Sequence, residues 1–425
     1  MKNRIILTIF TAFLSMNLFA QKAYTLNDCK EIAQKNNSTL KNSTLRIADA
    51  EQSKKEAFTN YFPVVNASAF GFKNNKPLYS MNFGTAQIEV LKSGIVAGVT
   101  AIQPIYSGGK IYYGNKLSKV GLEMSQYQHQ VTKNGVLLEV EKDYWQIVSL
   151  TEKLKTVQSI GNSLDTLFKK VKLSNQAGFA LSNEVLRVKL KQNETDASLS
   201  KISNGIILAK MALCQQMGLP MDSATQLEVA TPDFGRLVSP IDFVVEHENV
   251  VSDRPEYKML NKNVTIAQLE TKIKRSEYLP SVAVGINYGY DNLIKGSHLS
   301  GMAFATLSIP ISEWWGGSYA LKKQQIKERI AENEYREGKD LLLLEMRQIQ
   351  NELNESFRQI QISELSVKES TENLRLNTDY YNAGTVDLTA YLDAQTLLVE
   401  SKNKYIDACI EYLINKTKYS QVTAR

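Results

Sequence analysis

The chain has 425 residues, of which 43% are apolar, and 50 Lys and Arg residues balance 44 Asp and Glu residues. These values exclude a disordered chain, and the sparse Gly, Pro and Cys residues exclude collagen-like and disulfide-scaffold proteins. The negative mean hydropathy argues against a helical membrane transporter. A net charge of +6, to which Lys2 and Arg4 contribute, does not indicate a nucleic-acid-binding surface.

The first segment of the chain has the features of a secretory signal peptide over residues 1–20. Basic Lys2 and Arg4 precede an apolar stretch over residues 5–14, and Ala20 stands at the expected cleavage position. The stretch is too short to span a bilayer, and no other apolar run reaches the roughly 18 residues of a transmembrane helix. An exported chain of this kind is either soluble or inserted in a membrane as β-strands.

The three cysteines, Cys29, Cys214 and Cys409, are odd in number, widely spaced and surrounded by helix-like sequence. They do not form the pattern of a disulfide framework, although the chain is expected to be exported. We therefore predict that they are small buried side chains.

Three sequence landmarks occur twice in the same order, about 206 to 217 residues apart. Each copy has an aromatic residue near a proline, then a proline before a Gly-Gly pair, and finally an Ala-Gly pair inside long helical sequence. Recurrence in one order at nearly one spacing indicates duplication of a single structural unit. The landmarks are Tyr61-Phe62-Pro63 and Tyr278-Leu279-Pro280, Gln103-Pro104-Ile105 and Ile309-Pro310-Ile311, and Ala177-Gly178 and Ala383-Gly384.

The duplication predicts two structural repeats, residues 21–218 and 254–425, joined by a proline-containing linker over residues 219–253. Each repeat reads helix, strand, strand, long helix, turn, helix. The linker forms either an equatorial belt around the helices or a plain surface connection. The expected helices cover residues 25–58, 110–175, 182–217, 254–277, 319–380 and 387–422, and the expected strands cover residues 62–73, 92–106, 281–290 and 301–311.

The predicted strands carry the pattern of membrane β-strands. Large apolar residues alternate with small or polar ones from Val282 to Tyr290, so one face is apolar. About ten residues are enough for a strand to cross a bilayer. A strand of a soluble sandwich is the alternative. Aromatic residues expected at the membrane interface gather near the strand ends: Tyr61, Phe62, Tyr106, Tyr278, Trp314 and Trp315.

Four strands are too few to close a barrel, for which about eight is the practical minimum. Every backbone hydrogen-bonding group in lipid needs a partner, so open sheet edges are excluded there. Membrane strands in this chain therefore require an oligomer that shares one barrel, and three copies would supply twelve strands.

The helical segments over residues 110–175 and 319–380 contain no proline and little glycine. About 65 residues at 1.5 Å each form a rod of roughly 100 Å. Heptad-like apolar seams, such as Leu342, Met346 and Ile349, require partner helices packed side by side. The sequence therefore predicts helices arranged like staves around a ring.

These features together resemble the TolC-like outer-membrane efflux proteins. The likeness rests on the signal peptide, the duplicated strand-strand-helix plan and the paired turns around Ala177-Gly178 and Ala383-Gly384. It extends from Tyr24 to near Tyr419. The resemblance implies an α+β fold that is mostly α: a homotrimeric 12-stranded transmembrane β-barrel, with four strands per chain, continued by a long periplasmic coiled-coil α-barrel.

The resemblance also implies a function and partners. The protein would be the outer-membrane exit duct of a tripartite efflux or type I secretion system, conducting substrates passively across the outer membrane. A periplasmic adaptor (membrane fusion) protein would join it to an inner-membrane pump of the resistance-nodulation-division or ABC type. The strands would contact outer-membrane lipid, and nucleic acid is not an expected partner. Drugs, metal ions, amphiphiles and polypeptides all remain candidate substrates, because a duct encodes little of its partners' specificity.

The resemblance places an adaptor-docking site at two helix-hairpin tips. A plain turn is the alternative, and glycine suits either role because a helix reversal needs a left-handed residue. The tips are Ala177, Gly178 and Phe179 in the first repeat, and Ala383, Gly384 and Thr385 in the second.

A pore constriction is expected just beyond the tips. The resemblance assigns it to Glu184 and Asp393, taken as equivalent positions of the two repeats. In an oligomer their copies would form a carboxylate ring that attracts cations; solvated surface acids are the alternative. Val386 and Ala390 stand where some family members carry charge, so a charged latch is not expected.

No catalytic, cofactor or metal site is predicted. His129, His247 and His298 are isolated, no HExxH or CxxC spacing occurs, and Gly108-Gly109-Lys110 lacks the rest of a phosphate-binding loop. An enzyme is therefore not expected. The competing interpretation is a soluble periplasmic coiled-coil adaptor or scaffold protein, in which the alternating segments form a small β-sandwich.

Overall fold

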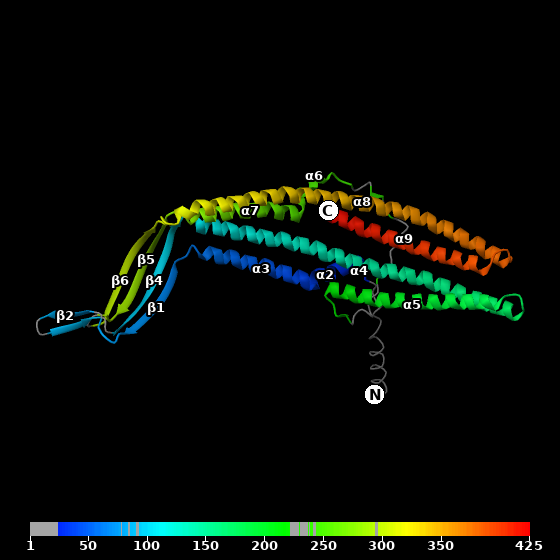
Figure 1. Cartoon of the computed structure of the whole chain (residues 1–425), viewed down its shortest axis with the longest axis horizontal. Helices are drawn as coiled ribbons and strands as arrows, with labels where there is room; N and C mark the ends of the chain where they lie inside the picture. The colour runs from blue at the N-terminus through cyan, green and yellow to red at the C-terminus, as the bar shows by residue number, and fades with distance from the viewer. Residues whose placement is uncertain are drawn as a thin grey trace, which may run out of the picture. The chain divides into compact units, whose positions relative to one another are not determined.

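The computed structural model describes residues 24–77, 79–83, 86–90, 93–221, 229, 237, 239–240, 244–293 and 296–425. The predicted signal peptide and much of the predicted linker lie outside these residues. The described part is mostly helical and contains a four-stranded antiparallel sheet, as the expected fold class requires. It divides into two compact units, and most of their elements are labelled in Figure 1.

The two compact units do not follow the boundaries of the predicted repeats. One unit, here called the helical unit, consists of the described residues up to Ser43 together with His129–Arg254 and Leu341–Arg425. The other, the sheet unit, consists of Thr44–Gln128 and Pro255–Asp340. Each unit combines parts of both repeats, because strands and helices from different repeats pair and pack with each other.

The sheet unit is built on four strands in the order β1-β4-β5-β6, with all neighbours antiparallel. The central pair joins the two repeats, with Val99 of β4 opposite Tyr288 of β5. The β4–β5 register shifts just after Pro104, a residue that cannot donate to a ladder. The strands are β1 (Val64–Lys73), β4 (Ser93–Ser107), β5 (Ser281–Asp291) and β6 (His298–Ser308), and a separate hairpin pairs β2 (Tyr79–Phe83) with β3 (Ala86–Val90).

The strand register gives this sheet one apolar face and one more polar face. On the polar face, Asn287 Nδ2 donates to Thr100 Oγ1 at 2.6 Å. Large side chains on the apolar face are uncovered, since Ile286 is 62% and Leu299 64% exposed. Two adjacent rows across the apolar face are Ala67, Val99, Tyr288 and Gly301, followed by Val65, Ala101, Ile286 and Ala303.

Four helices adjoin these strands in sequence. Two of them lead into strands β1 and β5, and two leave strands β4 and β6. Within the sheet unit, Lys262 Nζ lies 2.6 Å from Glu123 Oε2, which ties two of these helices together. None of the described helices combines the length and the apolar composition needed to cross a membrane. The helices are α3 (Ser38–Thr59), α7 (Pro255–Ser276), α4 (Lys110–Gln176) and α8 (Trp314–Asn382).

The helical unit has a core in which residues such as Val140, Ile147 and Leu213 are fully buried. Cys29, Cys214 and Cys409 are buried and unpaired, as predicted. Burial raises the pKa of the Cys29 thiol to about 12. The further elements of the unit are α2 (Leu26–Asn36), α5 (Ser182–Met217), α6 (His247–Val250), the 3₁₀ helix η4 (Val251–Asp253) and α9 (Leu388–Val422).

One buried carboxylate links three helices of the helical unit. Glu141 of α4 is 3% exposed, and its Oε2 lies 2.5 Å from Lys30 Nζ of α2. Its Oε1 accepts hydrogen bonds from Trp145 Nε1 at 3.1 Å and from Thr417 Oγ1 of α9 at 2.7 Å. A buried charge is tolerated only when it is paired and hydrogen-bonded, so these donors fix where α2 and α9 meet α4.

The structure corrects the predicted helix over residues 25–58. The segment forms two helices divided at Asn37, whose Oδ1 accepts hydrogen bonds from the backbone N–H groups of Thr39 and Leu40. The Asn37 side chain also donates to the carbonyl oxygen of Gln216 at 2.8 Å. An asparagine that caps the following helix in this way is a known start signal, which the apolar periodicity alone did not reveal.

Other predicted bounds also change. The strand expected over residues 301–311 is His298–Ser308, because Pro310 cannot extend the ladder. Helix α8 begins at Trp314 instead of residue 319, so both tryptophans predicted at the membrane interface are helical. The β2–β3 hairpin, α6 and η4 were not predicted, since elements this short carry too little periodicity to be recognised.

Gly218 ends α5 with a left-handed backbone, at a φ of 67°. A Cβ atom at this position would lie 2.5 Å from the carbonyl oxygen of Asn36. Gly218→Ala is therefore expected to lower the free energy of unfolding by about 2 kcal/mol, through backbone strain and a backbone clash. Thermal unfolding followed by circular dichroism in detergent measures the effect.

Gly135→Ala is the matched control, because Gly135 lies within α4 and its Cβ position meets no atom within 4 Å. Alanine is the better helix former, so this variant should be unchanged or slightly more stable. An equal loss of stability in the two variants would contradict the explanation.

Candidate functional site

The helix-hairpin tips lie where the sequence placed them, between α4 and α5 and between α8 and α9. Gly178 and Gly384 have φ values of 82° and 74°, the left-handed conformation that ends a helix most easily in glycine. The N–H of Phe179 donates to Ser174 O at 2.8 Å, and that of Thr385 donates to Tyr380 O at 2.9 Å. Each tip is therefore a helix ending with the six-to-one hydrogen bond of a Schellman turn.

The two tips have the same pattern of backbone hydrogen bonds. The N–H groups of Ala177 and Ala383 donate to the carbonyl groups of Leu173 and Asp379, both at 3.0 Å. The next residues repeat the match, with Gly178 N to Asn175 O at 3.0 Å and Gly384 N to Tyr381 O at 3.1 Å. This identity of backbone geometry agrees with the duplication inferred from the landmarks.

The side chains of the tips differ although the backbones match. Phe179 is 89% exposed at the first tip, and the neighbouring Leu181 is also exposed. At the second tip Thr385 Oγ1 donates to Tyr380 O at 3.0 Å, and Asp387 caps α9 by accepting from the Ala390 N–H at 3.0 Å. The first tip thus presents an apolar projection, whereas the second presents short polar side chains.

A compact apolar cluster holds the two hairpins together behind the tips. Its buried members include Leu164, Val171, Val188 and Leu388, which come from both repeats. Tyr381 and Tyr391 stack beside it, with ring centroids 5.5 Å apart. The tips are therefore carried on a packed four-helix end.

Polar contacts supplement this cluster. Gln395 Nε2 donates to the Tyr391 hydroxyl at 2.9 Å and to Ser163 Oγ at 3.1 Å, which links α9 to α4. Lys170 Nζ donates to Asn382 Oδ1 at 2.6 Å. The Arg187 guanidinium of α5 donates to Thr389 Oγ1 of α9. These contacts connect the two hairpins without an ion pair at Val386 or Ala390.

Glu184 and Asp393 occupy different environments. Glu184 is half-buried. Burial of Tyr381 raises the pKa of its hydroxyl, and the negative charge of Glu184 raises it further. Asp393 is exposed on α9.

The two acids are also not equivalent positions of the repeats, which corrects the assumption made from sequence. Glu184 stands six residues after its tip glycine and Asp393 nine, so Arg187 occupies the place that corresponds to Asp393. Three residues displace a side chain by about 60° around a helix and by most of one turn along it. Two acidic levels, rather than one, are therefore available near the tips.

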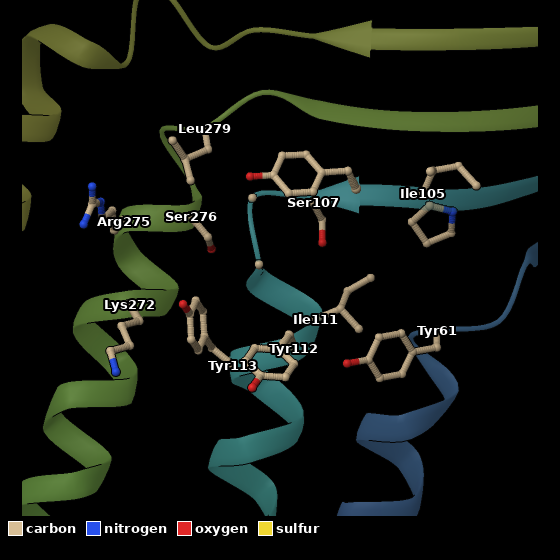
Figure 2. A pocket seen from close by; sticks show the side chains of 14 residues that line it. Tyr61, Ile105, Ser107, Ile111, Tyr112, Tyr113, Lys272, Arg275, Ser276 and Leu279 are labelled. Atoms are coloured by element: carbon tan, nitrogen blue, oxygen red, sulfur yellow. The ribbon is translucent and has the colours of Figure 1, made fainter.

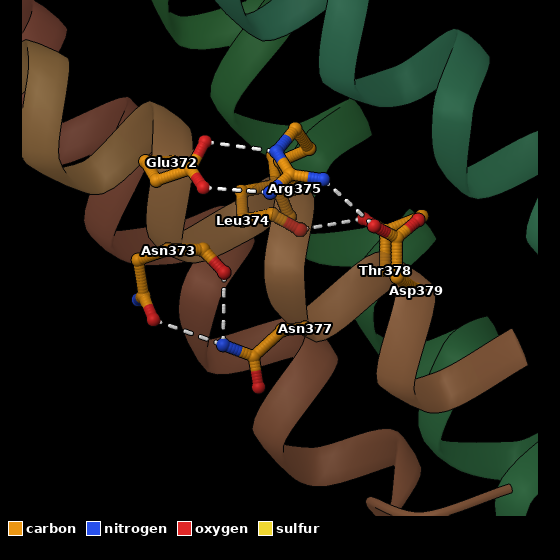
Figure 3. Close-up of polar contacts among 7 residues, drawn as sticks. All are labelled: Glu372, Asn373, Leu374, Arg375, Asn377, Thr378 and Asp379. Atoms are coloured by element: carbon orange, nitrogen blue, oxygen red, sulfur yellow. Dashed lines mark hydrogen bonds and ion pairs between the residues drawn. The ribbon is translucent and has the colours of Figure 1, made fainter. Parts of the chain in front are cut away.

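A charged group on α8 was missed by the sequence analysis (Figure 3). Arg375 donates from Nε and Nη2 to the two carboxylate oxygens of Glu372, at 2.8 and 2.7 Å, and from Nη1 to Asp379 Oδ2 at 2.9 Å. The hydrogen bonds from Arg375 lower the pKa of Glu372. All three side chains are exposed, so the group contributes little stability. The acid-to-base spacings of three and four residues along one helix are the signal that could have revealed it.

The predicted interface aromatics all lie in the sheet unit, where helices join strands. The Phe58 ring packs against the rings of Tyr61 and Phe62, with centroids 5.6 Å apart in each pair. Trp314 Nε1 donates to the carbonyl oxygen of Tyr278 at 3.0 Å. The remaining two, Tyr106 at the end of β4 and Trp315 at the start of α8, are exposed.

Among the described residues, no group of three or more His, Cys, Asp and Glu side chains could hold a metal ion.

Solved structures identify the class of fold. The chain superposes on the outer-membrane channel OprN with a TM-score of 0.81, at 16% identity and over 94% of this chain and 89% of that one. The CmeC outer membrane channel of Campylobacter jejuni gives a TM-score of 0.81 at 15% identity, over 94% and 85% of the two chains. The outer membrane protein VceC of Vibrio cholerae gives 0.80 at 14% identity, over 94% and 95%. The fold is thus that of the outer-membrane channels.

Sequence comparison finds a family match over part of the chain. Residues 248–421 match the family model described as outer membrane efflux protein. The resemblance to the TolC-like outer-membrane efflux proteins, drawn from the landmarks and the paired turns, is therefore confirmed. No curated protein shows a significant sequence match to the chain.

The Tyr391 hydroxyl tests the polar link between the hairpins. Tyr391→Phe removes one of the two acceptors for Gln395 Nε2 in a buried site, where Gln395 Oε1 already lacks a partner. We expect the free energy of unfolding to fall by about 1 kcal/mol, the usual net worth of a hydrogen bond. Tyr380→Phe is the control, because Tyr380 is exposed on α8. Chemical denaturation in detergent compares the stabilities of the two variants. An equal loss in both would show that the hydrogen bond between Tyr391 and Gln395 does not stabilise the protein.

Proposed function

We propose that the protein is a passive exit duct in the outer membrane, and not an enzyme. In this proposal it serves a tripartite efflux or type I secretion system and conducts substrates that a pump and adaptor deliver from the periplasm. The observation that carries the proposal is the four-stranded sheet with one uncovered apolar face, in a chain whose second half matches the outer membrane efflux protein model.

The edges of this sheet favour a shared barrel. β1 and β6 are the outermost of the four strands, so each is paired on one side only within the sheet. Unpaired backbone groups cannot remain in lipid, and four strands cannot close on themselves. Three copies joined edge to edge, β6 of one to β1 of the next, would provide a closed barrel of twelve strands.

The exposed faces of the helical unit support the same oligomer. On α5, Leu190 and Leu208 are exposed and stand 18 residues apart, which is five turns along one face. On α8, Leu344 and Ile362 are exposed with the same spacing. The positions between them on these faces are mostly polar, so each helix offers two separate apolar contact points to a neighbour. We infer that α5 of one copy packs against α8 of the next.

Membrane extraction, mass and conductance test the proposal. The expressed protein should resist carbonate washing, migrate as a trimer in mild detergent and give discrete openings in planar bilayers. A chain released by carbonate as a monomer would favour the alternative, a soluble periplasmic adaptor or scaffold, and would overturn the duct.

Glu184 and Asp393 are proposed as the acids of the pore constriction. Asp393→Asn should lower the preference for cations more than Glu184→Gln, because Asp393 is exposed and Glu184 is half-buried near Tyr381. Reversal potentials in a salt gradient measure the preference. Glu369→Gln, which removes an exposed acid of α8, is the control and should have no effect. Unchanged selectivity in both test variants would eliminate the acidic constriction.

The tips, Ala177-Gly178-Phe179 and Ala383-Gly384-Thr385, are proposed as the docking site for the adaptor. An exposed aromatic side chain is a frequent anchor in protein interfaces. Phe179→Ser should therefore reduce the adaptor recovered with the duct from cells, while trimer mass and conductance stay unchanged because the side chain is 89% exposed. Full recovery of the adaptor with the variant would show that Phe179 is only part of a turn.

A further inference from the structure

A cavity of about 590 Å³ opens in the sheet unit where helices meet strands (Figure 2). It lies between the end of β4, the start of α4 and the last turns of α7, with Tyr61 at one side. Its characteristic lining consists of four tyrosines and two basic residues: Tyr61, Tyr106, Tyr112, Tyr113, Lys272 and Arg275.

The two basic residues bring positive charge to the cavity. Lys272 and Arg275 stand three residues apart on α7, so they lie on the same side of the helix, and both are exposed. Lys272 Nζ lies 5.8 Å from the centre of the Tyr113 ring, which is seen between α7 and α4 in Figure 2. Neither residue forms an ion pair within the described part of the chain, and no acidic residue lines the cavity.

One lining residue, Tyr106, relates the cavity to the apolar face of the sheet. In the β4–β5 register Tyr106 stands opposite Val282. Val282 shares its side of β5 with Ile286 and Tyr288, because alternate residues of a strand point to the same face. Tyr106 therefore belongs both to the lining of the cavity and to the face of the sheet that we propose faces lipid.

We propose that this cavity binds the phosphate headgroup of an anionic phospholipid whose acyl chains lie along the apolar face of the sheet. The inference rests on the proposed function, since it requires the sheet to lie in a membrane. The Arg275 guanidinium would donate to the phosphate oxygens, and Lys272 would supply a second positive charge. The tyrosines, which have an apolar ring and a polar hydroxyl, suit the boundary between headgroups and acyl chains.

A lipid accounts for the whole arrangement better than a free anion does. A free phosphate would use the two cations only, and exposed charges bind it weakly because salt and water screen them. A phospholipid adds burial of its acyl chains against residues such as Ile286, next to the headgroup. The cavity would thus fix the depth of the sheet in the inner leaflet.

Native mass spectrometry of the intact oligomer tests the proposal. Phosphatidylglycerol titrated into the detergent-solubilised protein should give one tightly bound lipid per chain, and phosphatidylcholine should bind more weakly. The double variant Lys272→Gln/Arg275→Gln should bind phosphatidylglycerol about thirtyfold more weakly, if each cation contributes about 1 kcal/mol. Inorganic phosphate at the same excess should not displace the lipid.

Lys327→Gln/Arg329→Gln is the matched control, because it removes the same two charges from exposed positions on α8. It should bind phosphatidylglycerol like the unmodified protein. Equal weakening in the two double variants, equal binding of the two lipids, or displacement by inorganic phosphate would each overturn the lipid site.

Conductance separates this inference from the proposed function. A protein that forms channels in bilayers but shows no specific lipid would refute the cavity proposal and leave the duct intact. A protein that forms neither oligomer nor channel would refute the duct, and the lipid site with it.

Discussion

Backbone hydrogen bonding at the two outer strands is the constraint on which the proposed architecture depends. The sheet has four strands, an uncovered apolar face and outer strands β1 and β6 that pair on one side only within it. In water such edges could be solvated, but in lipid each unpaired group would cost several kcal/mol. The membrane is therefore compatible with this sheet only when copies of the chain complete one another. Neighbouring copies would also cover exposed apolar side chains on α5 and α8, such as Leu190 and Leu344.

In the helical unit, the main structural requirement is that very long helices end and reverse direction at defined residues. Left-handed glycines make the reversals, and the cluster around Leu164 and Leu388 keeps the two hairpins side by side. Among its buried polar groups, Glu141 has three donors from three helices. Such a satisfied carboxylate determines which helices meet more strictly than apolar packing does, since a shifted helix would leave the charge unpaired.

Local chemistry explains which features could be predicted from sequence. The strands, the long helices and the tips carry repeated signals: alternation in β5, proline-free heptads in α4 and α8, and Ala-Gly pairs at the turns. Residue-specific signals were harder to recognise, such as the helix break at Asn37, which depends on one side chain capping the next helix. The pairing of β4 with β5 joins residues that are 174 to 195 positions apart, and no local pattern encodes such a partnership. The cavity beside Lys272 and Arg275 was hidden for the same reason, because its walls come from separate parts of the chain.

Glu184 and Asp393 do not stand at equivalent positions of the two repeats. Both acids follow an Ala-Gly tip, and only counting from the left-handed glycines places them at different heights. Arg187, at the position that corresponds to Asp393, donates to Thr389 of the other hairpin. One repeat thus uses this position for a contact between hairpins, while the other keeps an exposed acid there. Duplication has preserved the backbone here more faithfully than the chemistry.

The unlike side chains on matching tips carry a consequence for stoichiometry. A ring of three chains would present six backbone turns of nearly the same shape, yet aromatic and polar ends would alternate around it. The backbone of the rim would then have nearly sixfold symmetry, whereas its side chains would have only threefold symmetry. A partner that recognises only the backbone shape could bind at six sites. A partner that binds the Phe179 side chain would have three such sites and would need different contacts at the other three tips.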